Sequence, residues 1–100
     1  MRYDKLVRDK IPELIGAKGE ECLFHIAEDE EYATKLYEKL REETEELIRE
    51  RNIGEVADVL EVVDAIISRE GFSRNEVEAA KSKKREERGG FGGRIILDES

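Results

Sequence analysis

The sequence predicts a mainly all-α protein in which a central helical hairpin is flanked by further helices. Apolar residues recur every three or four positions through the middle of the chain, and capping residues and glycines divide this part into helices. Charged residues make up 44% of the sequence and hydrophobic residues 38%, a balance typical of charged helical proteins rather than of sandwiches or barrels. The 100 residues suit a single domain, 1–100, or a subunit that completes its core in an oligomer.

Two short elements are expected outside the hairpin. Residues 5–15 (KLVRDKIPELI) should form a short helix whose regularity is limited by Pro12. Residues 21–27 alternate between apolar and other side chains as a strand does, and residues 94–97 (RIIL) form a second apolar segment. We therefore expect a minor two-stranded β element that pairs 21–27 with 94–97.

Three longer helices are predicted between these two segments. The first covers about residues 29–51, with Asp29 as a plausible N-cap. The second covers about 52–71, where Asn52 and the glutamate three residues later have the spacing of a capping box. The third covers about 73–88. Because the link between the first two is short, they should be antiparallel neighbours joined by a tight turn.

Composition excludes several classes of function. The formal net charge of −8 argues against nucleic acid as the main partner, because phosphate contacts need a basic face. Cys22 and His25 are the only residues of their types, so neither a disulfide framework nor a His/Cys zinc site is expected. The highly charged start is unlike a signal peptide, and no apolar run is long enough to cross a membrane. We expect a cytoplasmic protein without a membrane partner.

Two glutamates of the first long helix lie where apolar residues are expected. Counted from Leu40, Glu43 falls about 60° from the centre of the apolar stripe and Glu46 about 120° from it, on the same side. Glu42 and Glu45 should point to the opposite, solvated face. A surface helix has no need to place acids beside its core residues.

The next helix is apolar on two sides. One side, the Leu60 stripe, consists of Ile53, Val56, Ala57, Leu60, Val63 and Ile67. The other side, the Val62 stripe, consists of Val59, Val62 and Ile66. Extending the Val62 stripe back by one turn reaches Glu55, with Asp58 along its flank. A helix that is apolar on two sides is usually buried between neighbours, so these acids should be drawn inward as well.

Four carboxylates drawn into an interior predict a divalent metal site. Buried bare charge destabilises a fold, and all-oxygen ligands select Mg²⁺, Mn²⁺ or Ca²⁺ over zinc. The pattern also fits a simpler interpretation, in which Glu55 only caps its helix and Glu43 extends from the edge of the stripe. Asp64, a further acid on the Leu60 stripe, is best explained as a hydrogen-bonded or salt-bridged core residue.

At these residues the sequence resembles a known superfamily. LREETEEL followed by EVADVL resembles the E-x-x-E and E-x-x-D signature of the MazG-like all-α nucleoside triphosphate pyrophosphohydrolases. The opening YDKLVRDKIPELI and the ending KREERGGFGGRIIL resemble a small subfamily described as phosphoribosyl-ATP pyrophosphohydrolase-like. The resemblance covers nearly the whole chain. By position, Glu43 and Glu46 match the first pair, and Glu55 and Asp58 match the second.

The resemblance implies a MazG-like, four-helix-bundle-type fold in a dimer and a defined chemistry. Mg²⁺, with Mn²⁺ as a substitute, would be held by Glu43, Glu46, Glu55 and Asp58. The metal would bind a nucleoside triphosphate or phosphoribosyl-ATP and activate water, giving the monophosphate and pyrophosphate. Glu43 or Glu46 would be the catalytic residue that accepts the proton. No base-recognition signature identifies the nucleotide.

The last helix carries a cationic stripe that could hold phosphates. Its members, spaced i, i+3, i+4 and i+7, are Lys81, Lys84, Arg85 and Arg88. They would contact the β- and γ-phosphates, or they would be solvated cations that favour the C-terminal helix dipole. Arg8 and Lys10 are weaker candidates for the same role.

A function of another class fits the same fold. A non-catalytic helical dimer could act as a nucleotide sensor or as an adaptor, with or without the metal, and would lack turnover. Both hypotheses expect a homodimer or a dimer of dimers, because one hairpin leaves the Val62 stripe to be covered by the last helix or by a second chain. We expect two hairpins to pack as a four-helix bundle around a two-fold axis.

Overall fold

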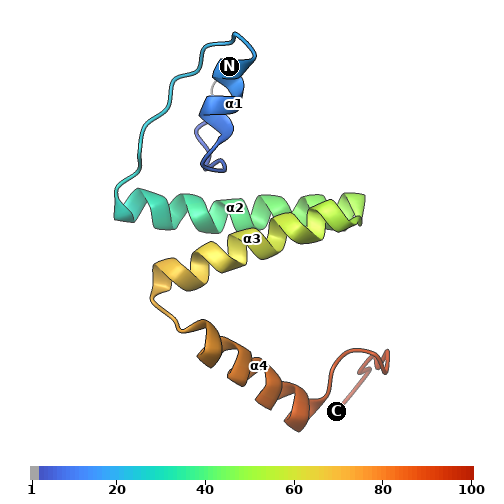
Figure 1. The fold of residues 1–100 in the computed structure, drawn as a ribbon. Coiled ribbons are helices and arrows are strands. Elements are labelled where there is room, and N and C mark those ends of the chain that lie inside the picture. The colour runs from blue at the N-terminus through green and yellow to red at the C-terminus, as the bar shows by residue number, and fades with distance from the viewer. Residues whose placement is uncertain (1–2) are drawn as a thin grey trace.

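A computed structural model describes residues 3–100, and this part of the chain contains four helices and no strand. The helices are α1 (Ile11–Ala17), α2 (Asp29–Glu50), α3 (Ile53–Glu70) and α4 (Arg74–Arg88). The all-α prediction is confirmed. Helices α2 and α3 form an antiparallel hairpin at the centre, whereas α1 lies on one side of it and α4 points away on the other (Figure 1).

Local capping explains where the hairpin turns. Arg51 adopts the left-handed conformation, with φ 49°, and ends α2. The Asn52 side chain then accepts a hydrogen bond of 3.0 Å from the Glu55 backbone N–H and so caps α3, as its spacing predicted. Gly71, with φ 75°, ends α3, and Ser73 caps α4. The turn between α2 and α3 is therefore short, and the two helices lie side by side.

An ion pair holds the open end of the hairpin. Arg69, near the end of α3, donates to Asp29 at the start of α2, with 2.8 Å between Nη2 and Oδ2. This hydrogen bond lowers the pKa of the Asp29 carboxyl below its usual value. Asp29 is the first residue of α2 rather than its N-cap, which is Glu28, and Glu28 makes no side-chain capping bond.

The predicted helix over residues 5–15 begins later than expected. Helix α1 starts at Ile11, with Pro12 in its first turn, where a proline fits because that N–H has no helical partner. The residues before it form an irregular segment, 3–10, that lies on the same side of the hairpin as α1 (Figure 1). We call residues 3–10 the N-terminal segment.

The predicted pairing of 21–27 with 94–97 is wrong, because no strand occurs in residues 3–100. The two segments lie at opposite ends of the molecule, one joining α1 to α2 and the other beyond α4 (Figure 1). Both are open to solvent: Leu23 is 103% exposed and Ile95 is 87% exposed. Two short strands alone are marginally stable in water, so alternation in the sequence was not enough to pair them.

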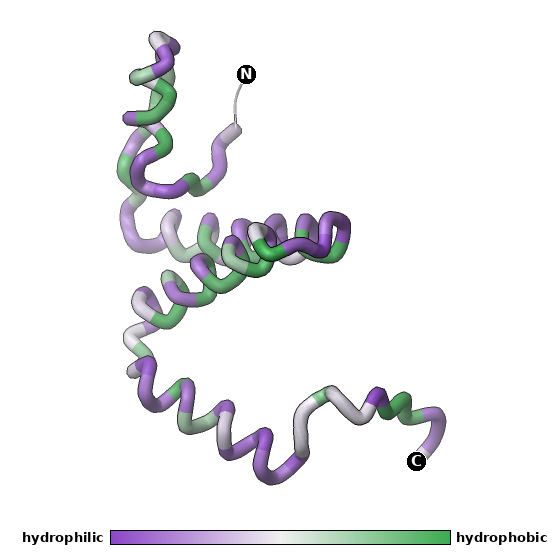
Figure 2. Tube along the Cα trace, turned by 45° about the vertical axis from the view of Figure 1, so that its right-hand side comes forward, coloured by the Kyte–Doolittle hydropathy of each residue, from purple (hydrophilic) through white to green (hydrophobic). Residues whose placement is uncertain are grey.

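The chain has a small core of its own. Within residues 3–100 the buried apolar side chains are Leu36 on α2 and Val62 on α3. The Val62 stripe therefore faces α2, and we correct the expectation that it needs α4 or a second chain. The Leu60 stripe is the open one, with Ile53 89% and Leu60 57% exposed. Figure 2 shows hydrophobic residues concentrated along the hairpin, whereas α4 is mainly hydrophilic.

The molecule is extended for its size. Its radius of gyration is 17.7 Å, whereas a compact 100-residue domain has about 13 Å. Helices α2 and α3 form the one extensive helix–helix contact within the described residues, so a four-helix bundle is not formed inside one chain. Of the helices in this part of the chain, none has the length and apolar character needed to cross a bilayer.

Candidate metal centre

Three of the four predicted acids come together on the facing sides of the hairpin. One carboxylate oxygen each from Glu43, Glu55 and Asp58 lies within 4.8 Å of the other two. Glu43 comes from α2, and Glu55 and Asp58 come from the first two turns of α3. The helical phase read from the sequence thus placed these three side chains correctly. We call them the acidic cluster.

The acidic cluster is partly removed from solvent. Glu43 is 7% exposed, and Glu55 and Asp58 are half-buried. Oε2 of Glu43 and Oε2 of Glu55 are both buried and have no hydrogen-bond partner among residues 3–100. Buried polar oxygens without partners are rare and costly, and a bound ion is one of the few ways to satisfy them.

The environment of Glu43 disfavours its charged form. Burial is the largest cause of the raised pKa of this carboxyl, and the neighbouring charges of Glu46 and Asp58 act in the same direction. Lys39 opposes the shift, with its Nζ 3.2 Å from Oε1 of Glu43. A divalent cation in the acidic cluster would favour the ionised form of Glu43 as Lys39 does, and it would carry twice the charge of Lys39.

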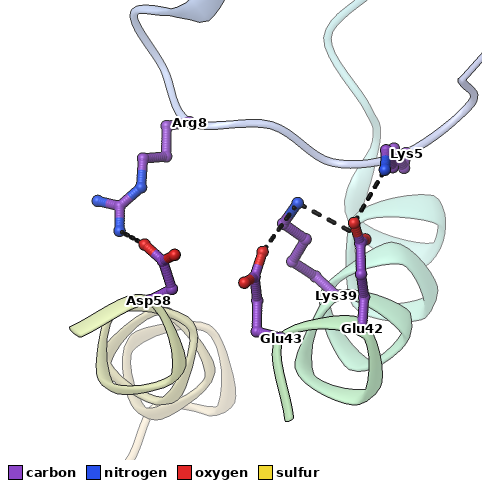
Figure 3. A network of polar contacts seen from close by, with 6 residues as sticks. All are labelled: Lys5, Arg8, Lys39, Glu42, Glu43 and Asp58. Atoms are coloured by element: carbon purple, nitrogen blue, oxygen red, sulfur yellow. Dashed lines mark hydrogen bonds and ion pairs between the residues drawn. The ribbon is translucent and has the colours of Figure 1, made fainter. Parts of the chain in front are cut away.

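Three cations surround the acids (Figure 3). Lys39 on α2 bridges Glu43 and Glu42, with 3.6 Å from Nζ to Oε2 of Glu42. From the N-terminal segment, Arg8 donates through Nη2 to Oδ1 of Asp58 at 2.8 Å, and Lys5 donates to Oε1 of Glu42 at 2.8 Å. These cations neutralise the rim of the acidic cluster but leave the two buried oxygens without partners.

The three glutamates closest to Glu43 in the sequence, Glu42, Glu45 and Glu46, have different environments. Glu46 lies outside the group of three but close enough for its charge to raise the pKa of Glu43. Glu45 is exposed, as predicted. Glu42 is not on a fully solvated face, because Lys5 and Lys39 cover it and lower the pKa of its carboxyl. The sequence could not show the contact with Lys5, which comes from the start of the chain.

The cationic stripe of α4 is placed away from the acidic cluster. Lys81, Lys84, Arg85 and Arg88 are all exposed. Within the described residues their side chains form no ion pair with the hairpin, and α4 diverges from it (Figure 1). Lys10 is likewise exposed, whereas Arg8 contacts Asp58 directly. Of the sequence-predicted cations, Arg8 is the one that the fold of a single chain brings to the acids.

Three other residues considered in the sequence analysis lie outside the acidic cluster. Asp64 pairs with Arg74, with 2.6 Å between Oδ1 and Nη2, so it is a salt-bridged acid as expected. His25 is exposed and lies 2.9 Å from Oε1 of Glu31, not in a strand. Cys22 is an exposed free thiol. None of the three belongs to the acidic cluster.

Two contacting cations, Lys5 and Lys39, were missed by reasoning from the sequence. Lys39 lies four residues before Glu43, a spacing that places the two side chains on one helical face, so this pair could have been found. Lys5 gives no such signal, because its partner is 37 residues away in the sequence.

The donor set fits a hard divalent cation. Two oxygens on opposite sides of one Mg²⁺ lie about 4.2 Å apart, so a small adjustment of the three carboxylates would let them share an ion. Comparison of the chain with protein-family models, with curated proteins and with solved structures gives no match. The function must therefore be inferred from the residues and geometry of the site.

Proposed function

We propose that this protein is a Mg²⁺-dependent nucleotide pyrophosphohydrolase of the MazG-like kind, cleaving a nucleoside triphosphate or phosphoribosyl-ATP to the monophosphate and pyrophosphate. One observation carries the proposal: Glu43 and Glu55 bury unpartnered carboxylate oxygens beside Asp58, on facing helices. The E-x-x-E and E-x-x-D spacing of the same acids supports it independently.

Glu43, Glu55 and Asp58 would hold the metal, with Mn²⁺ as a substitute for Mg²⁺. When bound, the ion would offset phosphate charge and acidify water. Lys39 favours the ionised form of Glu43, since its Nζ contacts Oε1, while the buried Oε2 is left without a partner among residues 3–100. Glu46 stands beside these ligands, and its carboxylate forms no ion pair or hydrogen bond within residues 3–100. It is our choice for the residue that accepts a proton from water.

The proposal includes a homodimer, or a dimer of dimers, and its support is that the chain exposes more surface than a compact monomer of its mass. The chain exposes 9257 Å², whereas a compact monomer of its 11.5 kDa mass exposes about 5,800 Å². The difference exceeds the roughly 1,000–2,500 Å² that each partner buries in an obligate homodimer. Exposed Ile53, Val56 and Leu60 lie along one face of α3 and supply an apolar contact surface. A second copy packed there would build the four-helix bundle.

The deciding experiment is a screen of the purified full-length protein for pyrophosphate release. Nucleoside triphosphates and phosphoribosyl-ATP would be offered with Mg²⁺, with EDTA as the control. Pyrophosphate and a monophosphate in equal amounts support the proposal. Metal binding without turnover of any nucleotide would instead favour the sensor or adaptor, and absence of metal binding at millimolar Mg²⁺ or Mn²⁺ would exclude the metal-dependent hydrolase.

A further inference from the structure

We propose that Lys5 and Arg8 of the N-terminal segment are phosphate-binding residues, which exchange their carboxylate partners for the polyphosphate of the substrate once the metal is bound. The inference rests on the proposed function and identifies residues that contact its substrate. In the sequence analysis the stripe of α4 was the main candidate for holding the phosphates, and Arg8 was a weaker one; Lys5 was not considered.

The position of Arg8 supports this exchange. Its Nη2 lies 2.8 Å from Oδ1 of Asp58, and its Nη1 lies 3.5 Å from Oε1 of Glu61. Asp58 is also one of the three acids able to share a metal ion. A guanidinium and a divalent cation therefore compete for one carboxylate, and the metal would weaken the pairing of Arg8 with Asp58 by like-charge repulsion.

Both cations are free to move toward another anion. The side chain of Arg8 is 54% exposed and that of Lys5 is 45% exposed, so changing partners carries little desolvation cost. Lys39, in contrast, has an 18% exposed side chain and is held between two acids. The segment that carries Lys5 and Arg8 has no regular secondary structure apart from a turn before α1, which leaves its backbone able to adjust.

The chemistry of the two side chains suits a polyphosphate. The guanidinium fork of Arg8 matches two phosphate oxygens, and the ammonium of Lys5 provides a point charge beside them. Arg8 lies on Asp58 of the acidic cluster, on the α3 side, and Lys5 lies on Glu42, next to Glu43, on the α2 side (Figure 3). A polyphosphate bound to a metal at this cluster would contact both cations on the side of the hairpin that the N-terminal segment covers.

The test uses Mn²⁺ alone and Mn²⁺-imidodiphosphate, a non-hydrolysable pyrophosphate analogue, titrated into the full-length protein by calorimetry. Arg8→Ala should raise the affinity for Mn²⁺ alone, because Asp58 loses its competing partner. At saturating Mn²⁺ the same variant should bind imidodiphosphate about tenfold more weakly, the scale of a lost charge-assisted hydrogen bond. Lys5→Ala should show the second effect, and Arg8→Lys should lose less than Arg8→Ala.

Lys18→Ala is the matched control, since Lys18 is an exposed cation of the same N-terminal part and lies outside the acidic cluster. It should leave both affinities unchanged, and circular dichroism should show equal helical content in all variants. Unchanged imidodiphosphate affinity in both Arg8→Ala and Lys5→Ala, with Mn²⁺ still binding, would overturn this inference alone. Failure of the wild-type protein to bind Mn²⁺ would overturn the proposed metal site itself.

Discussion

Glu43 on α2 and Glu55 on α3 each bury a carboxylate oxygen that finds no hydrogen-bond partner in residues 3–100. The two side chains face each other across the hairpin, close enough to share one ligand with Asp58. Their burial opposes folding unless a cation compensates it. Lys39 and Arg8 supply part of that compensation from the rim, and the two inner oxygens remain to be satisfied.

The first prediction concerns stability with metal. Mg²⁺ or Mn²⁺ should raise the melting temperature, because an ion that binds the native state alone stabilises it. At a hundredfold excess over the dissociation constant the gain would be about 2.7 kcal/mol, or about 10 °C or more for a domain of this size. Differential scanning fluorimetry with and without EDTA measures it.

The matched variants are Glu55→Gln and Glu45→Gln, which remove one carboxylate inside the acidic cluster and one outside it. Glu55→Gln should reduce the stabilisation by metal, and Glu45→Gln should retain it. Equal stabilisation of both variants would mean that the metal binds elsewhere.

The second prediction concerns the pH dependence of the metal-free protein. Because the pKa of Glu43 is raised above its ordinary value near 4.5, the native state binds more protons than the unfolded state between these two values. The free energy of unfolding should therefore decrease as pH rises through that window. The charged groups responsible, besides burial, are Glu46 and Asp58, with Lys39 opposing them.

Glu43→Gln removes this titration. The variant should gain stability over the wild-type protein as pH rises above 4.5, and the two should converge as pH falls toward that value. Urea unfolding at several pH values in EDTA measures the difference. A wild-type curve parallel to that of Glu43→Gln throughout would show that Glu43 titrates normally.

Helical periodicity and capping predicted much of the site. Glu43 and Glu55 were found because each stands where its helix should be apolar, and burial follows from that phase. Asn52 was found because its cap depends on residues only three apart. Such local rules act within one helix, so one sequence was enough to apply them.

Relationships between distant segments could not be predicted in this way. The contacts of Lys5 and Arg8 depend on the path of an irregular segment, which no periodicity encodes. The expected pairing of 21–27 with 94–97 was wrong because an alternating pattern shows which side chains a strand would bury. It does not identify the strand that would pair with it. The choice of which stripe of α3 faces α2 also depends on packing between helices.

The third prediction concerns activity. If pyrophosphate release is observed, Asp58→Asn and Glu43→Gln should reduce it by about a hundredfold or more, the scale of losing a group that stabilises transition-state charge. Glu45→Gln should be nearly silent. Glu42→Gln, which weakens the pairing of Lys5 and leaves Lys39 paired with Glu43 alone, should have an intermediate effect because it disturbs the cations around the acidic cluster. Steady-state kinetics with Mg²⁺ held saturating separates these cases.

The fourth prediction concerns the turn of the hairpin. Asn52→Ala removes the side-chain acceptor for the Glu55 N–H and should lower the free energy of unfolding by about 1 kcal/mol. Asn75→Ala, at an exposed position in the first turn of α4, is the control and should have a smaller effect. Urea denaturation gives both values. If Asn75→Ala costs as much as Asn52→Ala, the cap is not the cause.

The fifth prediction concerns assembly through the Leu60 stripe. Light scattering at micromolar concentration should give at least twice the 11.5 kDa mass of the chain. Leu60→Glu places a charge on the open face of α3 and should dissociate the oligomer, because Leu60 is 57% exposed in the single chain. Val62→Glu is a poorer test of assembly, since Val62 is 8% exposed and a charge there would disrupt the hairpin itself.

Leu23→Glu is the control, because Leu23 is a fully exposed apolar residue in the segment between α1 and α2. It should leave the oligomer intact. The small core adds a second readout. Leu36 and Val62 are the buried apolar residues of the described chain, so subunits that separate should also lose stability. Leu60→Glu should therefore lower the melting temperature, and by more as a larger fraction of the protein becomes monomeric. A wild-type protein that is well folded at 11.5 kDa would contradict the proposed dimer.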